Sequence, residues 1–194
     1  MLVVYRHNPK TLMRFTFSIG EDAYITPLDL RDASAIFLET ERSRRYLREY
    51  LPWVDCVKGV EDTCNFINAE TKLIHEGRKI HVTIWQDDAF CGIASLFDID
   101  KVNRSATIGY WLGKRHQGKG LMTRTVKALI DHAISQLHLN RLELRAHTEN
   151  LPSQGVAKRL GFQHEGTLKQ AEWLYDKYVD LNVYGMTAER WKAQ

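Results

Sequence analysis

The sequence has few cysteines and no long apolar run. Its three cysteines, Cys56, Cys64 and Cys91, are odd in number, without metal-ligand spacing, and set among apolar or helical neighbours. They predict reduced, partly buried thiols and exclude a disulfide scaffold. The apolar run at the start is too short for a secretory signal, and no later stretch is long enough to span a membrane. These absences predict a cytoplasmic protein with no membrane partner.

The chain also lacks a strong excess of either charge. It carries 27 basic and 24 acidic residues, a formal net charge of +3. A nucleic-acid-binding protein is expected to be strongly basic, so nucleic acid is not an expected partner. There is no internal repeat and no low-complexity segment, and 194 residues with 44% apolar content suit one globular domain over 1–194. Residues 1–20 are expected to be an extension or an extra strand.

Two further kinds of site find no support. Eight histidines are present, but there is no His-Glu-x-x-His, and His132 and His138 do not fall on one helical face. The sequence therefore predicts no metal site. Covalent catalysis through Cys91 or Cys56 would need a placed base that nothing in the sequence indicates.

The most informative stretch present is the glycine-rich segment 115–120, Arg-His-Gln-Gly-Lys-Gly. It joins a strand-like run, 106–112, to an amphipathic helix pattern that begins at Leu121. Glycines permit turns that a Cβ would block, so backbone N–H groups and the positive end of the helix can converge on a phosphate. Basic residues crowd the segment and the next helix: Lys114, Arg115, Lys119, Arg124, Lys158 and Arg159. A solvated charged face is the alternative, but the pattern as a whole indicates a phosphorylated ligand, with His116 as a phosphate neighbour.

Two familiar phosphate loops do not fit this segment. Counted from Gly113, it gives Gly-x-x-x-x-Gly-Lys, but Gly120 stands where a magnesium-binding Ser or Thr belongs. Counted from Gly118, it gives Gly-x-Gly-x-x-Thr123, without the third glycine of a dinucleotide-binding loop.

What remains, Arg/Gln-x-x-Gly-x-Gly/Ala, resembles the pyrophosphate loop of the GCN5-related N-acetyltransferase (GNAT) superfamily. Segment 150–162, with Asn-x-x-Ser and a closing Leu-Gly-Phe, is similar to the segment that follows in that superfamily. Segments 169–175 and 46–53 look like its RimJ/RimL branch, the ribosomal-protein N-terminal acetyltransferases. The resemblance covers most of residues 21–187.

The apolar pattern alternates between strand and helix periods. Strands are predicted at 14–19, 23–28, 80–85, 90–99, 105–112, 141–146, 162–174 and 178–186. Helices are predicted as two stretches within 29–50, one at 60–77, one at 121–137 and one between Pro152 and Gly161. The strand–helix–strand unit 105–146 implies a parallel strand pair, and the hairpins imply antiparallel neighbours. The fold class is therefore α/β (α+β), and the resemblance implies a GNAT fold, with a mixed, mostly antiparallel sheet, a splayed parallel pair and flanking helices.

The resemblance further implies acetyl-coenzyme A (acetyl-CoA) as co-substrate and no metal. Backbone groups of Tyr110, Trp111 and Leu112 would bind the pantetheine amides, and a backbone N–H near Leu112 would meet the oxyanion. The other coenzyme contacts that it implies are Arg115, Gln117, Gly118, Lys119, Gly120, Leu121, Met122, Asn150 and Lys158. For Asn150, binding to the neighbouring backbone is an alternative.

For catalysis, the resemblance places a general base at Glu172 and a general acid at Ser153. An amine must lose a proton to react, and the departing thiolate must gain one. A surface carboxylate is the alternative role for Glu172, and helix capping is the alternative for Ser153. Tyr110, Tyr175 and Tyr178 are rival acids.

The acceptor is less well defined. Trp53, Trp173 and Tyr175 are expected to line its slot, although aromatic residues more often belong to a core. Three hypotheses stay open: acetylation of the N-terminal Ser or Ala of a ribosomal protein, acetylation of a small amine such as a polyamine, antibiotic or amino acid, and a non-catalytic acetyl-CoA-binding module. The resemblance also implies a homodimer.

Overall fold

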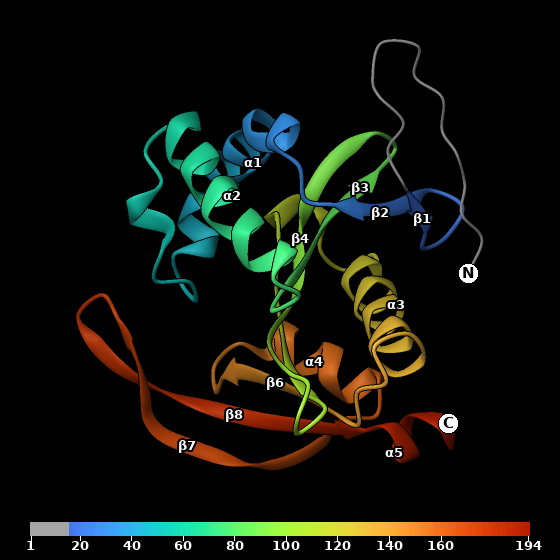
Figure 1. The fold of residues 1–194 in the computed structure, drawn as a ribbon. Helices are drawn as coiled ribbons and strands as arrows, with labels where there is room; N and C mark the ends of the chain where they lie inside the picture. The colour runs from blue at the N-terminus through green and yellow to red at the C-terminus, as the bar shows by residue number, and fades with distance from the viewer. Residues whose placement is uncertain (1–15) are drawn as a thin grey trace.

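A mixed sheet of eight strands runs through the computed structural model, which describes residues 16–194 (Figure 1). Its strand order is β1-β2-β3-β4-β5-β6-β8-β7, and every neighbouring pair is antiparallel except β5 with β6. The strands are β1 (Phe17–Ser18), β2 (Ala23–Pro27), β3 (Ile80–Gln86), β4 (Ala89–Asp100), β5 (Ser105–Leu112), β6 (Arg141–His147), β7 (Gln163–Leu174) and β8 (Lys177–Thr187). The α-helices are α1 (Ala33–Leu47), α2 (Val60–His75), α3 (Leu121–Ser135), α4 (Leu151–Arg159) and α5 (Ala188–Lys192). Three 3₁₀ helices complete the described elements: η1 (Leu30–Asp32), η2 (Val54–Cys56) and η3 (Lys114–His116).

Helices cover both faces of the sheet, so the molecule has two apolar clusters (Figure 1). The smaller cluster joins α1 and α2 to Phe90 and Ile93 of β4. The larger cluster lies on the side of α3 and α4 and includes Ala94 and Leu96 of the same strand. Because successive strand residues point to opposite faces, β4 serves both clusters. Its 12 residues therefore form the centre of the fold.

Helix α3 confirms the apolar stripe predicted from the sequence. Five of its stripe residues are buried: Met122, Val126, Leu129, Ile130 and Ala133. Burying a side chain of the size of Leu or Ile contributes about 1.5–3 kcal/mol, so this face anchors the helix to the sheet. The first turn of α3, which follows the glycine-rich segment, is thereby fixed in position.

The parallel strands β5 and β6 pair along only part of their length. The ladder joins Ser105–Ile108 to Arg141–Leu144, while the strands continue to Leu112 and His147. Beyond the last pair the two strands separate, as the family resemblance implied. The last residues of β5 therefore present a backbone edge that β6 does not cover.

The hairpin of β7 and β8 carries the edge of the sheet away from the rest of the molecule (Figure 1). Strand β7 is the last strand of the sheet, and Leu174 is its one buried residue. Such an edge strand contributes little to the core. Its side chains are available to contact other molecules.

Some predictions need correction. The first predicted strand is reduced to β1, and its residues Arg14 and Phe15 lie outside the described range. Helix α5 was not predicted; Thr187 caps it by accepting from the backbone N–H of Arg190 at 3.2 Å. Five residues are too few to show a helical period. Cys56 is exposed, whereas the sequence predicted partial burial for all three thiols.

Candidate functional site

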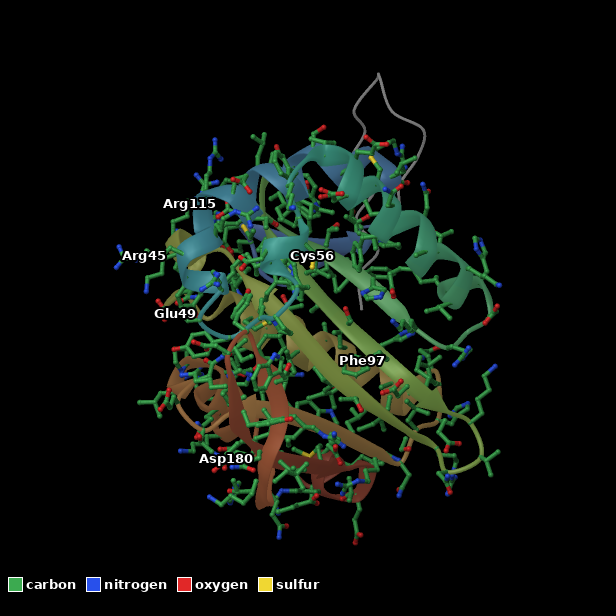
Figure 2. All side chains as sticks on the ribbon, turned by 90° about the vertical axis from the view of Figure 1, so that its left-hand side faces the viewer. Arg45, Glu49, Cys56, Phe97, Arg115 and Asp180 are labelled. Carbon is green, nitrogen blue, oxygen red and sulfur yellow. The ribbon has the colours of Figure 1, made fainter. Side chains whose placement is uncertain are left out.

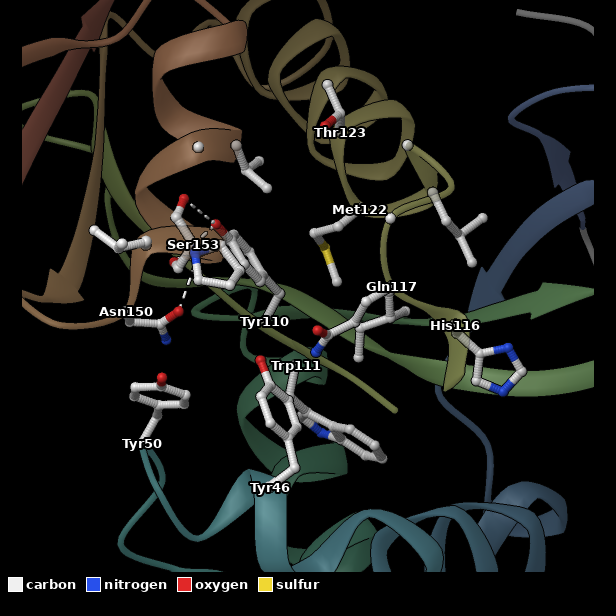
Figure 3. Close-up of a pocket in the computed structure, with 18 of the residues that line it drawn as sticks. Tyr46, Tyr50, Tyr110, Trp111, His116, Gln117, Met122, Thr123, Asn150 and Ser153 are labelled. Atoms are coloured by element: carbon white, nitrogen blue, oxygen red, sulfur yellow. Dashed lines mark hydrogen bonds between the residues drawn. The ribbon is translucent and has the colours of Figure 1, made fainter. Parts of the chain in front are cut away.

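A cavity of about 560 Å³ lies where the ends of β5 and β6 separate (Figure 3). Four parts of the chain form its walls: the C-terminal end of α1, the end of β5, the glycine-rich segment with the start of α3, and the start of α4. Its predicted site residues are Tyr110, Trp111, Leu112, Gln117, Gly118, Gly120, Leu121, Met122, Asn150 and Ser153. These residues come from separate stretches of sequence, and the fold brings them together.

The glycine-rich segment turns its backbone toward this cavity. Gly118 and Gly120 have φ of +77° and +71°, a left-handed conformation that favours glycine. A Cβ added to either glycine would meet no atom within 4 Å, so the space beside them is open. The first N–H groups of α3 have no acceptor within the helix. Together these features make a cradle whose shape and polarity suit a phosphate group.

Two of the basic residues near the segment are held by carboxylates. Arg115 donates to Glu39 Oε2 at 2.8 Å, and Arg124 donates to Asp22 Oδ1 at 3.2 Å. Figure 2 shows Arg115 on the α1 flank of the molecule, on the same side as Arg45. These contacts orient the two side chains toward protein partners. Their charge serves first to fix the segment.

The other basic residues divide between the cavity and solvent. Arg159 of α4 lines the cavity, and its Nε donates to Thr123 Oγ1 at 3.2 Å. Lys119 and Lys158 are exposed and do not line the cavity. Among the described residues, Arg159 is therefore the arginine that lines this cavity. In the sequence it was one member of a group of basic residues.

Glu39 anchors the glycine-rich segment to α1. Its carboxylate is buried and accepts hydrogen bonds from Arg115 and from the Ser43 hydroxyl, the latter at 3.1 Å. Ser43 Oγ in turn accepts from the backbone N–H of Lys114 at 3.0 Å. A Cβ on Gly113 would come within 2.0 Å of Glu39 Oε1, so glycine is required for this close approach. No pattern in the sequence indicated this contact.

His116 is among the residues that line the cavity, and its side chain is largely buried (Figure 3). Arg115 Nε donates to its Nε2 at 3.0 Å, and its Nδ1 lies 3.3 Å from Cys91 Sγ. Burial lowers the pKa of His116 and raises the pKa of the Cys91 thiol to about 11. Because a guanidinium only donates, Nε2 accepts and the ring is the neutral Nδ1–H form. The ring is therefore held by Arg115 and Cys91, and its role as a phosphate neighbour stays a prediction.

Ser153 lies in the first turn of α4, but it is not the helix cap. Asn150 Oδ1 accepts from the backbone N–H of Ser153 at 3.1 Å, so Asn150 caps the helix and holds the neighbouring backbone (Figure 3). The Ser153 hydroxyl lies 3.0 Å from the Tyr110 hydroxyl, which also donates to the Ser153 carbonyl at 3.2 Å. Burial raises the pKa of Tyr110 to about 12. Two protonated hydroxyls thus lie together at the wall of the cavity.

Glu172 does not line this cavity. The His147 and Tyr50 side chains connect it to the edge of the cavity. Its Oε2 accepts from His147 Nε2 at 2.9 Å. The His147 ring packs edge-on to Tyr50, with ring centroids 6.0 Å apart. Tyr50 lines the cavity and also a second, adjoining hollow of about 460 Å³. The two spaces therefore meet at Tyr50.

The three aromatic residues expected in an acceptor slot lie in different places. Tyr175 lines the second hollow. Trp53 packs against Trp111, with ring centroids 6.1 Å apart, behind the wall of the first cavity. Trp173 is 52% exposed and packs edge-on against Tyr178 on the hairpin. Only Tyr175 thus reaches a hollow directly.

Two tyrosines of the cavity had no predicted role. Tyr46 and Tyr50 lie four residues apart near the end of α1, so they share one side of the chain as it leaves the helix. Their segment, 46–53, was singled out by resemblance alone. A spacing of four among aromatic residues was the available signal. His147 carried no signal in the sequence.

Comparisons with known proteins agree with this geometry. The sequence model of the acetyltransferase (GNAT) domain family matches residues 23–163. The chain is 36% identical over 143 residues to the ribosomal-protein-serine acetyltransferase of Escherichia coli (strain K12), covering 74% of this chain and 80% of that protein. The solved structure of RimL, a ribosomal L7/L12 alpha-N-protein acetyltransferase in complex with coenzyme A, has a TM-score of 0.86 at 26% identity, covering 90% of this chain and 99% of that one. The microcin C7 self-immunity acetyltransferase MccE, in complex with acetyl-CoA and AMP, has a TM-score of 0.83 at 26% identity, covering 87% and 94%.

Proposed function

Since this chain belongs to the acetyltransferase (GNAT) family, we propose that it transfers an acetyl group from acetyl-CoA to the N-terminal amine of a ribosomal protein that begins with Ser or Ala. The acetyltransferase activity follows from the family, and the acceptor is the proposal. It is supported by the similarity to a ribosomal-protein-serine acetyltransferase and to RimL. The observation that supports acetyl-CoA as the donor is the glycine cradle, which opens into a cavity between two separating strands.

The cavity suits acetyl-CoA in shape and polarity. The diphosphate would lie at Gly118 and Gly120, where open space meets the N-terminus of α3. The pantetheine amides would bond the uncovered edge of β5 at Tyr110–Leu112, in the place that a further strand would take. No metal enters the proposal.

Acetyl transfer forms a C–N bond and breaks the thioester C–S bond, so the amine must release one proton and the sulfur must gain one. Glu172 would accept the amine proton, directly or through water. Ser153 would donate its hydroxyl proton, with Tyr110 as the adjacent rival. Tyr175 donates to the Leu51 carbonyl at 2.8 Å and Tyr178 is 61% exposed, so Tyr110 is the better placed of the three rival tyrosines. A backbone N–H near Leu112 would stabilise the oxyanion.

The second hollow is the proposed entrance for the amine. It lies between the end of α1 and the turn of the β7–β8 hairpin, and it adjoins the cavity at Tyr50. Its lining includes three carboxylates, those of Glu49, Glu149 and Asp176. Arg48 and Lys177 also line it, so its formal net charge is one negative, which favours a cationic amine over an acidic group. This preference fits both a protein N-terminus and a small polyamine.

Thiol release from acetyl-CoA distinguishes the three hypotheses. We expect turnover with short peptides that begin with Ser or Ala, and little with polyamines, aminoglycosides or free amino acids. Turnover with those small amines alone would replace the proposed acceptor. Coenzyme binding without turnover on any acceptor would mean a binding module.

Replacing Glu39 with Gln should loosen the coenzyme cradle without affecting the chemistry. The change removes a buried ionic acceptor from Arg115, so the free energy of unfolding should fall by about 1–3 kcal/mol. The lower end applies because Arg115 is 52% exposed. We expect the dissociation constant of acetyl-CoA to rise several-fold at nearly constant kcat, measured by calorimetry and steady-state kinetics. Glu61→Gln, at an exposed position of α2, is the control, and an unchanged dissociation constant for Glu39→Gln would exclude the anchor.

We further propose a cytoplasmic homodimer without nucleic-acid or membrane partners. Within residues 16–194, no helix has the length and apolar character needed to cross a membrane. The homodimer rests on the family resemblance. Sedimentation equilibrium measures it directly, and a monomer at micromolar concentration would contradict it.

A further inference from the structure

Glu172 stands on a strand that cannot by itself hold a catalytic side chain in place. Strand β7 is the exposed edge of the sheet, and its pairing with β8 shifts register between Leu168 and Glu172. Within that irregular stretch Gln170 has φ of +48°. The Glu172 side chain is 32% exposed, so packing alone constrains its carboxylate little. A general base needs a narrower range of positions than this environment provides.

His147, by contrast, is held on all sides. It is the last residue of β6, pairs with Leu181 of β8, and is 8% exposed. Its carbonyl accepts from the backbone N–H of Asn150 at 2.9 Å and from Gln154 Nε2 at 3.1 Å. Gln154 is itself fixed, because its Oε1 accepts from the Tyr184 hydroxyl at 3.1 Å. The backbone that carries the imidazole is therefore rigid.

The contact between the two side chains is direct and has a defined polarity. His147 Nε2 lies 2.9 Å from Glu172 Oε2. A carboxylate only accepts, so Nε2 carries the hydrogen and donates it. This bond occupies one oxygen of Glu172 and leaves Oε1 for an amine or a water molecule. The Tyr50 ring, 6.0 Å away and edge-on, restricts the imidazole from the side of the cavity.

We propose that His147 is the positioning residue for Glu172: it ties the base on the hairpin to the rigid end of β6, beside the helix that carries Ser153. The inference rests on the proposed function, because it concerns the base of that reaction. In this arrangement β6, which ends at His147, sets the distance between Glu172, which accepts the amine proton, and Ser153, which donates a proton to the sulfur. The sequence places the two residues 25 positions apart, and the fold joins them.

Two substitutions at His147 separate positioning from packing. In His147→Leu, which fills the space without a donor, kcat should fall about 10–100-fold, the range expected when a catalytic group is displaced by about 1 Å. The dissociation constant of acetyl-CoA should stay within about twofold, since the coenzyme cradle lies elsewhere. In His147→Gln, the amide Nε2–H can reach the same oxygen, so most of kcat should return. His75→Leu, at an exposed histidine at the end of α2 whose Nδ1 lies 2.8 Å from the Thr71 carbonyl oxygen, is the matched control.

A double-mutant cycle provides the decisive test. If His147 acts through Glu172, adding His147→Leu to Glu172→Gln should lower kcat no further. A purely structural role would lower kcat in both backgrounds and would overturn the inference, as would full kcat in His147→Leu alone. If Glu172→Gln itself leaves kcat unchanged, the base assignment fails instead, so the two failures are distinguishable.

Discussion

Glu172→Gln is expected to bind acetyl-CoA normally and to turn over about 10²–10⁴ times more slowly, the range that general base catalysis contributes. The amide keeps the shape of the carboxylate and can still accept a hydrogen bond from His147 through its Oε1. It cannot take a proton from the amine. Steady-state kinetics with a Ser-starting peptide gives kcat, and calorimetry gives the dissociation constant of the coenzyme.

Glu165→Gln is the control for this experiment because it changes another carboxylate on the same strand. Glu165 forms an ion pair with Arg141 at 2.5 Å and lies away from both hollows. Pairs this exposed contribute little to stability, so kcat should be nearly unchanged. Equal losses of turnover and coenzyme affinity in Glu172→Gln would show a disturbed structure and would remove Glu172 from the role of base.

Gly118→Val should abolish measurable coenzyme binding, with an affinity loss of at least about 100-fold, while the protein stays folded. The valine Cβ would enter space where the free protein has no atom within 4 Å, the volume assigned to the diphosphate. Its branched side chain also disfavours φ of +77°, at a cost of about 1–3 kcal/mol, which would turn the backbone N–H groups out of line. Calorimetric titration with acetyl-CoA measures the loss, and thermal unfolding checks the fold.

Two further variants separate strain from obstruction. Asn tolerates the left-handed conformation better than most residues, so Gly118→Asn tests the need for empty space with little backbone strain. We expect it to lose most of the affinity as well. Gly166→Val, on β7, adds the same side chain where a Cβ meets no atom within 4 Å and should bind normally. Normal affinity in Gly118→Val would show that the diphosphate lies elsewhere.

Local patterns in the sequence were sufficient to predict most of the elements. The apolar stripe of α3 repeats over four turns, and the two glycines before it are typical of a turn. The strand–helix–strand order around α3 required the parallel pair. The separation of that pair beyond Ile108 was implied only by the resemblance. The apolar pattern of a strand does not show where its pairing with a neighbour ends.

Contacts between distant segments were the part that the sequence could not supply. Glu39 and Arg115 lie 76 positions apart, and either residue alone resembles an ordinary charged surface residue. Helix capping was the alternative role for Ser153, and it was wrong because Asn150 caps α4. Asn and Ser are both favoured capping residues, so only the geometry distinguishes them. The basic residues show the same limit, because Arg115 and Arg124 are paired with carboxylates from distant parts of the chain, and the sequence does not reveal these pairs.

The exposed hairpin has a consequence for how this molecule can diversify. Almost every β7 side chain is in solvent, so replacing one removes little buried area and leaves the free energy of unfolding nearly the same. The glycine cradle, fixed by the buried Glu39, has no such freedom. Substitutions on β7 can therefore change the surface of the hairpin while the glycine-rich segment and its anchor at Glu39 stay unchanged.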